Sequence, residues 1–245
     1  MSNKVLRLTI LVLQSVFLLA IVAIAIIGII TAQDYRTATM FAESLCRCVV
    51  TVAFTTYYYL SFAKNPNTTG MFFPLYLLMS LVTEIRIVDD FAKLNNTILI
   101  PPHITVYIFV FSSLVMVISL MGYGIFYQSN NTAANLYLLA GIVFSLLITT
   151  IIPKAPDADN VWDSTPLYLL EMSLFIIAMV IHLILLITET PGPYRVRHAV
   201  LFLIVVGNYL NLFHDTLPTT MAGTAIITVA LLIAIIIAKV RDVRL

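Results

Sequence analysis

Charge is scarce in this sequence. Aspartate, glutamate, lysine and arginine make up only 10% of its 245 residues, whereas soluble domains carry about 25%. Hydrophobic residues make up 61%. This composition excludes a water-soluble protein and predicts a chain that lies almost entirely within a lipid bilayer. Because the net charge is only +1 and no basic cluster occurs, we expect no nucleic-acid partner.

Glycine and cysteine are also rare. The eight glycines form no Gly-x-x-x-Gly motif, so no standard helix-dimer face is predicted. Transporters that alternate access often contain helices interrupted by glycine or proline, and the scarcity of both residues within the apolar runs favours a rigid bundle. Cys46 and Cys48 are two positions apart and would point to nearly opposite sides of a helix. We therefore expect neither a shared metal nor a disulfide between them.

Catalytic and cofactor motifs are missing. The sequence contains no His-Glu-x-x-His, no Gly-x-Ser-x-Gly and no phosphate-binding loop. The four histidines, His103, His182, His198 and His214, are expected at different depths in the membrane, which argues against a haem held by two of them. We therefore predict no enzymatic activity, no cofactor and no metal.

Long apolar runs are what the sequence has in abundance. Each is about 17–25 residues long, the length that the hydrocarbon core of a bilayer requires. We predict an all-α polytopic transmembrane helical bundle in which residues 1–245 form a single integral membrane domain. Its eight spans are expected at 8–32, 40–63, 71–92, 103–127, 133–152, 166–188, 198–214 and 218–239. Merging the last two, which only Thr-Leu-Pro separates, gives seven spans as the alternative.

Lysine and arginine in the loops predict the orientation. Eight of them fall on the side of the N-terminus and three on the other side, once Arg47 and Arg86 within spans are set aside. The positive-inside rule then places both termini in the cytoplasm. The expected location is a plasma membrane or a bacterial inner membrane.

Ionisable residues inside the predicted spans are the main indication of function. Charged groups at membrane depth are costly and point to functional sites. Placed by depth at about 1.5 Å per residue, nearly all of them fall in the outer half of the bundle. Six carboxylates against two arginines predict an outward-facing acidic pocket that binds a small cationic or polar ligand. The residues predicted to form it are Glu43, Arg47, Glu84, Arg86, Asp89, Asp90, Glu171, Asn208, Asn211, His214 and Asp215.

Structural roles are the alternative for several of these residues. Asp89, Asp90 and Asp215 could cap helix ends at the water interface. Glu43 and Arg47 are four positions apart and could pair on one helix face. Glu84 is expected to lie deeper and to point elsewhere, so it has the least obvious structural explanation.

The positions of polar residues also suggest an internal repeat. Asp34 precedes Glu43 by nine residues, and Asp163 precedes Glu171 by eight. Asp89-Asp90 and His214-Asp215 end the next span of each half at an offset of 125. We interpret this as a degenerate 4+4 parallel repeat, related by an axis along the membrane normal. The second, third, sixth and seventh spans would then surround the pocket.

The function that we expect is a receptor-type or sensor-type module. It would bind its ligand from the outside and signal to a cytoplasmic or membrane partner, with the lipid bilayer as its surroundings. One alternative is a small secondary transporter coupled to protons or cations, which requires a polar path below the pocket. The sequence offers little for such a path beyond Thr51, Thr55, Ser173 and His182. The other alternative is a structural subunit of a larger membrane complex.

Overall fold

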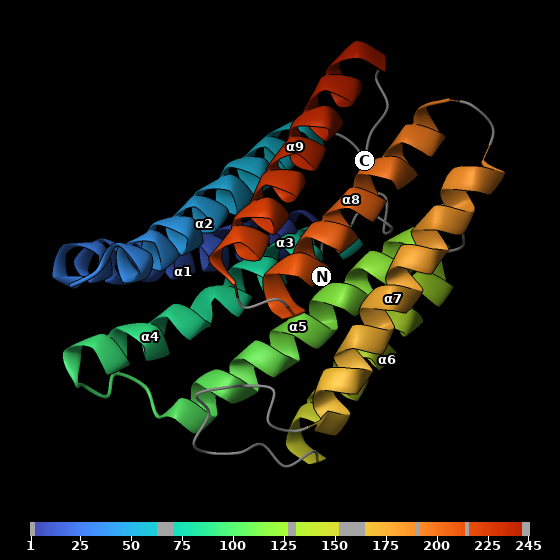
Figure 1. Cartoon of the computed structure of the whole chain (residues 1–245). Coiled ribbons are helices and arrows are strands. Elements are labelled where there is room, and N and C mark those ends of the chain that lie inside the picture. The colour runs from blue at the N-terminus through green and yellow to red at the C-terminus, as the bar shows by residue number, and fades with distance from the viewer. Residues whose placement is uncertain are drawn as a thin grey trace.

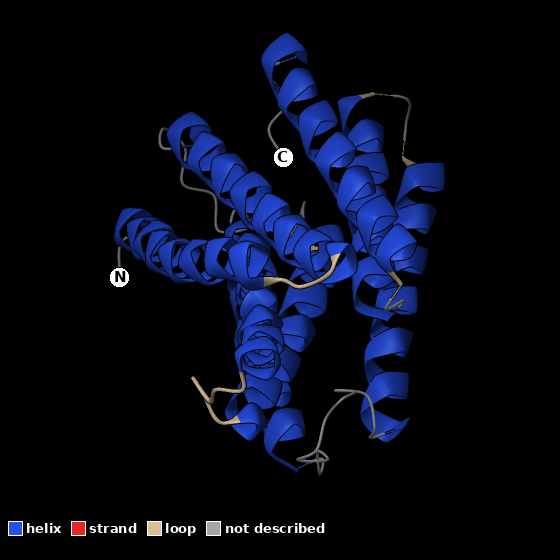
Figure 2. Ribbon diagram, turned by 60° about the vertical axis from the view of Figure 1, so that its left-hand side comes forward, coloured by secondary structure: helices blue, strands red, loops and turns tan. Residues whose placement is uncertain are grey.

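A computed structural model describes residues 3–62, 71–126, 131–151, 165–189, 192–213 and 216–241, and every element within these ranges is a helix (Figures 1 and 2). The elements are α1 (Asn3–Thr31), α2 (Tyr35–Phe62), α3 (Phe72–Val82), the 3-10 turn η2 (Thr83–Ile85), α4 (Arg86–Asn95), α5 (Pro102–Ile125), α6 (Asn131–Ile151), α7 (Thr165–Thr188), α8 (Pro193–Phe213) and α9 (Leu217–Arg241). Seven of them, α1, α2 and α5 to α9, are long and apolar enough to cross a membrane. The all-helical class is therefore confirmed.

The segment predicted as a span over residues 71–92 is helical but is interrupted by a 3-10 turn. The structure divides it into α3, η2 and α4. The break coincides with polar side chains: the Thr83 hydroxyl donates to the backbone carbonyl of Ser80 at 2.7 Å, and the Glu84 carboxylate is held by side chains of α2. A short 3-10 segment within a helix often marks strain or a hinge. Here Glu84 lies within this segment, and its carboxylate contacts side chains of α2.

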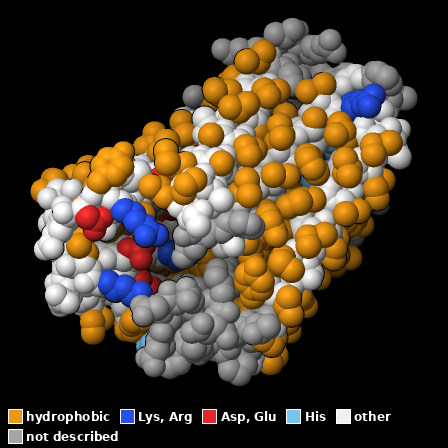
Figure 3. Space-filling model, viewed as in Figure 1, with side chains coloured by type: hydrophobic (Ala, Val, Ile, Leu, Met, Phe, Trp, Pro, Cys, Tyr) orange, Lys and Arg blue, Asp and Glu red, His pale blue; other side chains and the backbone are white. Residues whose placement is uncertain are grey.

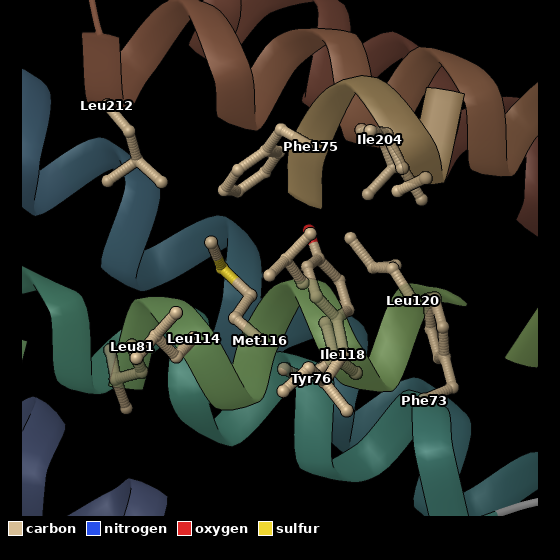
Figure 4. Packing of buried hydrophobic residues seen from close by; sticks show 14 of the residues in the cluster. Phe73, Tyr76, Leu81, Leu114, Met116, Ile118, Leu120, Phe175, Ile204 and Leu212 are labelled. Carbon is tan, nitrogen blue, oxygen red and sulfur yellow. The ribbon is translucent and has the colours of Figure 1, made fainter. Parts of the chain in front are cut away.

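The helix α5 is the centre of the bundle. It contacts α3, α4, α6, α7 and α8, and most of its residues from Thr105 to Gly124 are buried. The hairpins α1–α2 and α8–α9 stand beside it, and α2 meets α9 (Figure 1). Figure 4 shows the core between these helices, which includes Phe73, Tyr76 and Leu81 of α3, Leu114, Met116, Ile118 and Leu120 of α5, Phe175 of α7, and Ile204 and Leu212 of α8.

The polarity of the molecule is that of a membrane protein. Large apolar side chains cover the outer faces of the helices (Figure 3), and Leu19, Leu136 and Ile187 are each more than 60% exposed. Polar side chains lie inside instead, with Gln14 and Glu171 fully buried. A surface with so much apolar area is unfavourable in water but is well solvated by lipid tails.

Two glycines let α8 and α9 approach closely. A Cβ built on Gly223 would lie 2.6 Å from the carbonyl oxygen of Gly207 and would also overlap Oδ1 of Asn211. A Cβ on Gly207 would lie 2.8 Å from the carbonyl oxygen of Gly223. No side chain fits at such a contact, so glycine allows the two backbones to touch. The contact brings Asn211 directly against α9.

Candidate functional site

A pocket of about 520 Å³ lies between α2, η2, α4, α8 and α9, with Phe109 of α5 in its wall. The lining comes from the first half of α2, from η2 and α4, from the last turns of α8 and from the first half of α9. Because successive helices run in opposite directions, these segments meet at one end of the bundle (Figure 1). Acidic and basic side chains gather mainly at that end, at the left in Figure 3, whereas most of the remaining visible surface is hydrophobic.

Seven of the eleven predicted site residues line this pocket, namely Glu43, Arg47, Glu84, Arg86, Asp90, Asn208 and Asn211. Asp89 is not in the lining; it accepts a hydrogen bond from Thr105 on α5. Glu171 is also elsewhere, fully buried on α7, where Ser113 of α5 donates to it at 2.8 Å. His214 and Asp215 lie outside the described residues. The sixth predicted span, which corresponds to α7, was expected to border the pocket. The structure places α9 in the lining instead.

An ion-pair network crosses the pocket wall. The Arg47 guanidinium lies 3.0 Å from Oε2 of Glu84 and 3.8 Å from Oε1 of Glu43. The Ser44 hydroxyl donates to the same Glu84 oxygen. The Glu84 side chain is only 10% exposed and that of Arg47 24%. Because the pair is largely withdrawn from water, each charge depends on the other for stabilisation.

Threonines of α9 complete the network. Thr220 donates to Oε2 of Glu43 at 2.9 Å, and Thr224 donates to Oε1 of Glu43 at 3.1 Å. Together with Thr216 and Thr228 they form a stripe at every fourth residue along the pocket. Residues with this spacing lie on one face of a helix. This stripe was not predicted from the sequence, although threonine at every fourth position of an otherwise apolar helix indicates a polar face.

The charge of the described pocket lining is mixed and not mainly acidic. Among the described lining residues, the three acidic side chains Glu43, Glu84 and Asp90 face four basic ones, Arg36, Arg47, Arg86 and Lys93. The expected excess of carboxylates depended on residues that belong to the core or lie outside the described ranges. Arg36 and Lys93, in the first turn of α2 and the last turn of α4, were not among the predicted site residues but contribute to the lining. The pocket therefore has mixed charge.

The pocket lining also contains polar side chains without charge. They include Thr51, Ser80, Asn208 and Thr228. The Asn208 amide donates to the hydroxyl of Tyr76 at 3.1 Å and to the backbone carbonyl of Ile204 at 2.7 Å. The guanidinium carbon of Arg86 lies 5.1 Å from the centre of the Phe109 ring, which is a cation–π distance. A bound molecule would therefore meet both charged side chains and neutral hydrogen-bonding groups.

No group of three or more His, Cys, Asp or Glu able to hold a metal ion occurs in the described part of the chain. The carboxylates Glu43 and Glu84 are engaged by Arg47 and by hydroxyl donors. Comparisons of the chain with protein-family models, with curated proteins and with solved structures found no match. The geometry of the pocket is therefore the basis for assigning a function.

Proposed function

We propose that this chain is a multi-pass membrane binding module of the receptor or sensor type. Its ligand is a small molecule that carries both an acidic and a basic group on an apolar body. The observation that supports this proposal is the pocket of about 520 Å³ with four basic and three acidic side chains in its lining. This volume is within the range of small-molecule sites, about 300–1,000 Å³.

The lining offers a partner for each part of such a ligand. Arg36, Arg86 and Lys93 would receive a carboxylate, because guanidinium and ammonium groups form charge-assisted hydrogen bonds with it. Asp90 would receive the basic group, with Glu43 and Glu84 close by as members of the Arg47 network. The apolar part would contact Met40, Phe41, Val50, Ile87, Leu94, Phe109, Leu212, Leu217 and Ile227.

Placement in the membrane follows from the loop charges. In this proposal both termini are cytoplasmic, the pocket faces outward, and the membrane is a plasma membrane or a bacterial inner membrane. The unit Phe72–Asn95 would form the eighth span, because 24 residues rise about 36 Å and the hydrocarbon core is about 30 Å thick. The 4+4 repeat and a signalling partner in the membrane or cytoplasm stay predictions.

A matched set of probes tests the ligand class. Phenylalanine carries both charges, 3-phenylpropionate lacks the ammonium group, and 2-phenylethylamine lacks the carboxylate. The melting temperature of the detergent-purified protein is measured with each probe. We expect phenylalanine to raise the melting temperature more than either single-charge analogue does. A protein that none of the three stabilises, or that 2-phenylethylamine stabilises as strongly as phenylalanine, would contradict the proposal.

Two neighbouring aspartates supply the control. Asp90→Asn changes a lining residue, whereas Asp89→Asn makes the same chemical change one position away, outside the pocket. Only Asp90→Asn should reduce the rise in melting temperature that phenylalanine produces. Equal reductions in both variants would show that the effect does not come from the pocket.

A further inference from the structure

A second polar cluster lies at the opposite end of the bundle from the pocket. It consists of Tyr123 on α5, His182 on α7, and Arg197 and His198 on α8, all buried. The two imidazole rings are 6.0 Å apart between centres. The Arg197 guanidinium carbon lies 5.5 Å from the centre of the Tyr123 ring, and Arg197 also hydrogen-bonds to Tyr123. We refer to these four residues as the inner cluster.

Helix α8 fixes the separation of the two polar regions. His198 is in its second turn, and Asn208, on the floor of the pocket, is near its other end. Ten residues of α-helix rise about 15 Å. The inner cluster is therefore about half a bilayer away from the pocket. The four histidines were expected at different depths in the membrane, and this is wrong for His182 and His198, whose rings are neighbours in the folded chain.

One phenyl ring lies between the two regions. At the pocket side, Tyr76 accepts a hydrogen bond from Asn208 and is also bonded to Ser80. At the inner side, Tyr123 is bonded to Arg197. The Phe73 ring packs against both tyrosines, with ring centres 5.5 Å from Tyr76 and 6.0 Å from Tyr123. Figure 4 shows Phe73 and Tyr76 on the side of α3 that faces α5.

We propose that the pocket and the inner cluster are the two ends of a transmembrane route for protons, and that the Phe73 ring is its gate. Ionisable groups inside a membrane mark such relays, and an imidazole can accept a proton at one ring nitrogen and release one from the other. The side chain of His182 can pass a proton on because its Nε2 faces the carbonyl of Leu120 at 3.2 Å, which leaves Nδ1 as the acceptor. Each relay group releases one proton when it accepts another, so one O–H or N–H bond forms for each that breaks. A proton that enters from the pocket carboxylates then leaves through the imidazoles.

This route does not depend on which molecule the pocket binds. It does require that Phe73 moves aside, because its ring has no hydrogen-bonding group to connect the two tyrosines. Replacing the ring by a serine side chain removes the apolar barrier and leaves space for water between the two tyrosines. We therefore expect this variant to pass protons about tenfold faster, which corresponds to a barrier about 1.4 kcal/mol lower.

The test uses the full chain in liposomes that contain a pH-sensitive dye. A potassium gradient with valinomycin drives protons inward, and the rate of acidification is measured. We expect the wild-type protein to exceed protein-free liposomes and Phe73→Ser to be about tenfold faster than wild type. Phe54→Ser is the matched control, because the Phe54 ring packs edge-on against Phe73 at 5.7 Å and is equally part of the buried core. It should leave the rate close to that of wild type.

Histidine variants identify the inner end of the route. His182→Gln and His198→Gln keep polar side chains but cannot carry a proton as imidazole does, so each should bring the wild-type rate down to that of protein-free liposomes. A wild-type rate equal to that of protein-free liposomes would overturn the proposal even if Phe73→Ser does not fold. Equal acceleration by Phe73→Ser and Phe54→Ser would overturn it as well.

The melting-temperature test keeps this inference separate from the proposed function. Stabilisation by phenylalanine without proton flux would disprove the proton route and support the proposed binding pocket. Proton flux without stabilisation by any of the three probes leaves the route and removes the proposed ligand class.

Discussion

Arg47 on α2 and Glu84 in the 3-10 turn η2 are 37 positions apart in the chain and form an ion pair of 3.0 Å. The pair joins a span-length helix to the point where the α3–α4 unit is broken. Removing two charges from water is costly, and a pair of this kind is stable only when further hydrogen bonds satisfy both partners. Ser44 supplies one for Glu84, and Glu43 offers Arg47 a second carboxylate. The break and the charge pair therefore form one structural unit.

The first prediction concerns this pair. Arg47→Met removes the cation and leaves Glu84 largely buried beside Glu43, and we expect a loss of about 3 kcal/mol in unfolding free energy. Adding Glu84→Gln to Arg47→Met removes the stranded charge and should restore part of that loss. Reversible unfolding of the single and double variants in mixed micelles measures both values. Strictly additive effects would show that the two side chains do not interact energetically.

The second prediction concerns the threonine stripe of α9. Thr224→Val keeps the shape of the side chain but removes the hydrogen bond to Glu43, and it should cost about 1 kcal/mol. Thr228→Val is the matched control, because the Thr228 hydroxyl donates to the backbone carbonyl of Thr224 and does not reach the carboxylate. The two melting temperatures are compared with that of wild type. Equal losses would mean that the hydrogen bond to Glu43 adds nothing.

The third prediction concerns the close contact of α8 and α9. Gly223→Ala would force a methyl group against the Asn211 side chain and against the backbone of Gly207, and the backbone contact can be relieved only by separating the helices. We expect a loss of about 1–3 kcal/mol in stability and a weaker response to phenylalanine. The control is Gly141→Ala, whose methyl group would meet only the side chain of Ile118. If Gly141→Ala were the more harmful of the two, close backbone packing would not be the cause.

The fourth prediction concerns the start of α2 and its dependence on pH. Asp34 lies just before the helix and accepts hydrogen bonds from the backbone N–H of Thr37 at 2.7 Å and from its hydroxyl at 2.9 Å. These two bonds hold the pKa of Asp34 below its ordinary value of 3.8, and the bond from the backbone N–H has the larger effect. A lowered pKa in the folded state means that the stabilisation is fully present above pH 3.8 and is lost as the pH falls through the lowered value.

Asp34→Ala should therefore lower the melting temperature at neutral pH, and the difference from wild type should shrink on acidification below pH 3.8. Asp34→Asn keeps a capping side chain without a titrating group, and its effect should be smaller and should not vary in the same way with pH. The melting curves are recorded across this range of pH. A difference between wild type and Asp34→Ala that grows on acidification would contradict this account.

The sequence alone determined the class of the protein and the approximate positions of its helices. Apolar runs of bilayer length predict spans because the cost of exposing backbone groups to lipid leaves the helix as the only local solution. Depth along a helix is likewise readable, since each residue adds a fixed rise. For this reason Glu43, Arg47, Glu84 and Arg86 were correctly assigned to one end of the bundle, and they line one pocket.

Only the tertiary structure decided which way each side chain points. Asp89 and Asp90 are neighbours in sequence, yet Asp90 lines the pocket and Asp89 bonds to α5. Glu171 has the right depth but belongs to a helix that packs on the far side of α5, so it enters the core. For this reason neither Asp89 nor Glu171 adds a carboxylate to the described pocket lining. How a helix is rotated about its axis, and which helices it contacts, depend on packing against the rest of the bundle. The sequence pattern of a mostly apolar helix indicates little about either. The carboxylate of Glu84 and its partner Arg47 are the clearest case, because the sequence predicts their common depth and only the folded bundle brings them into contact.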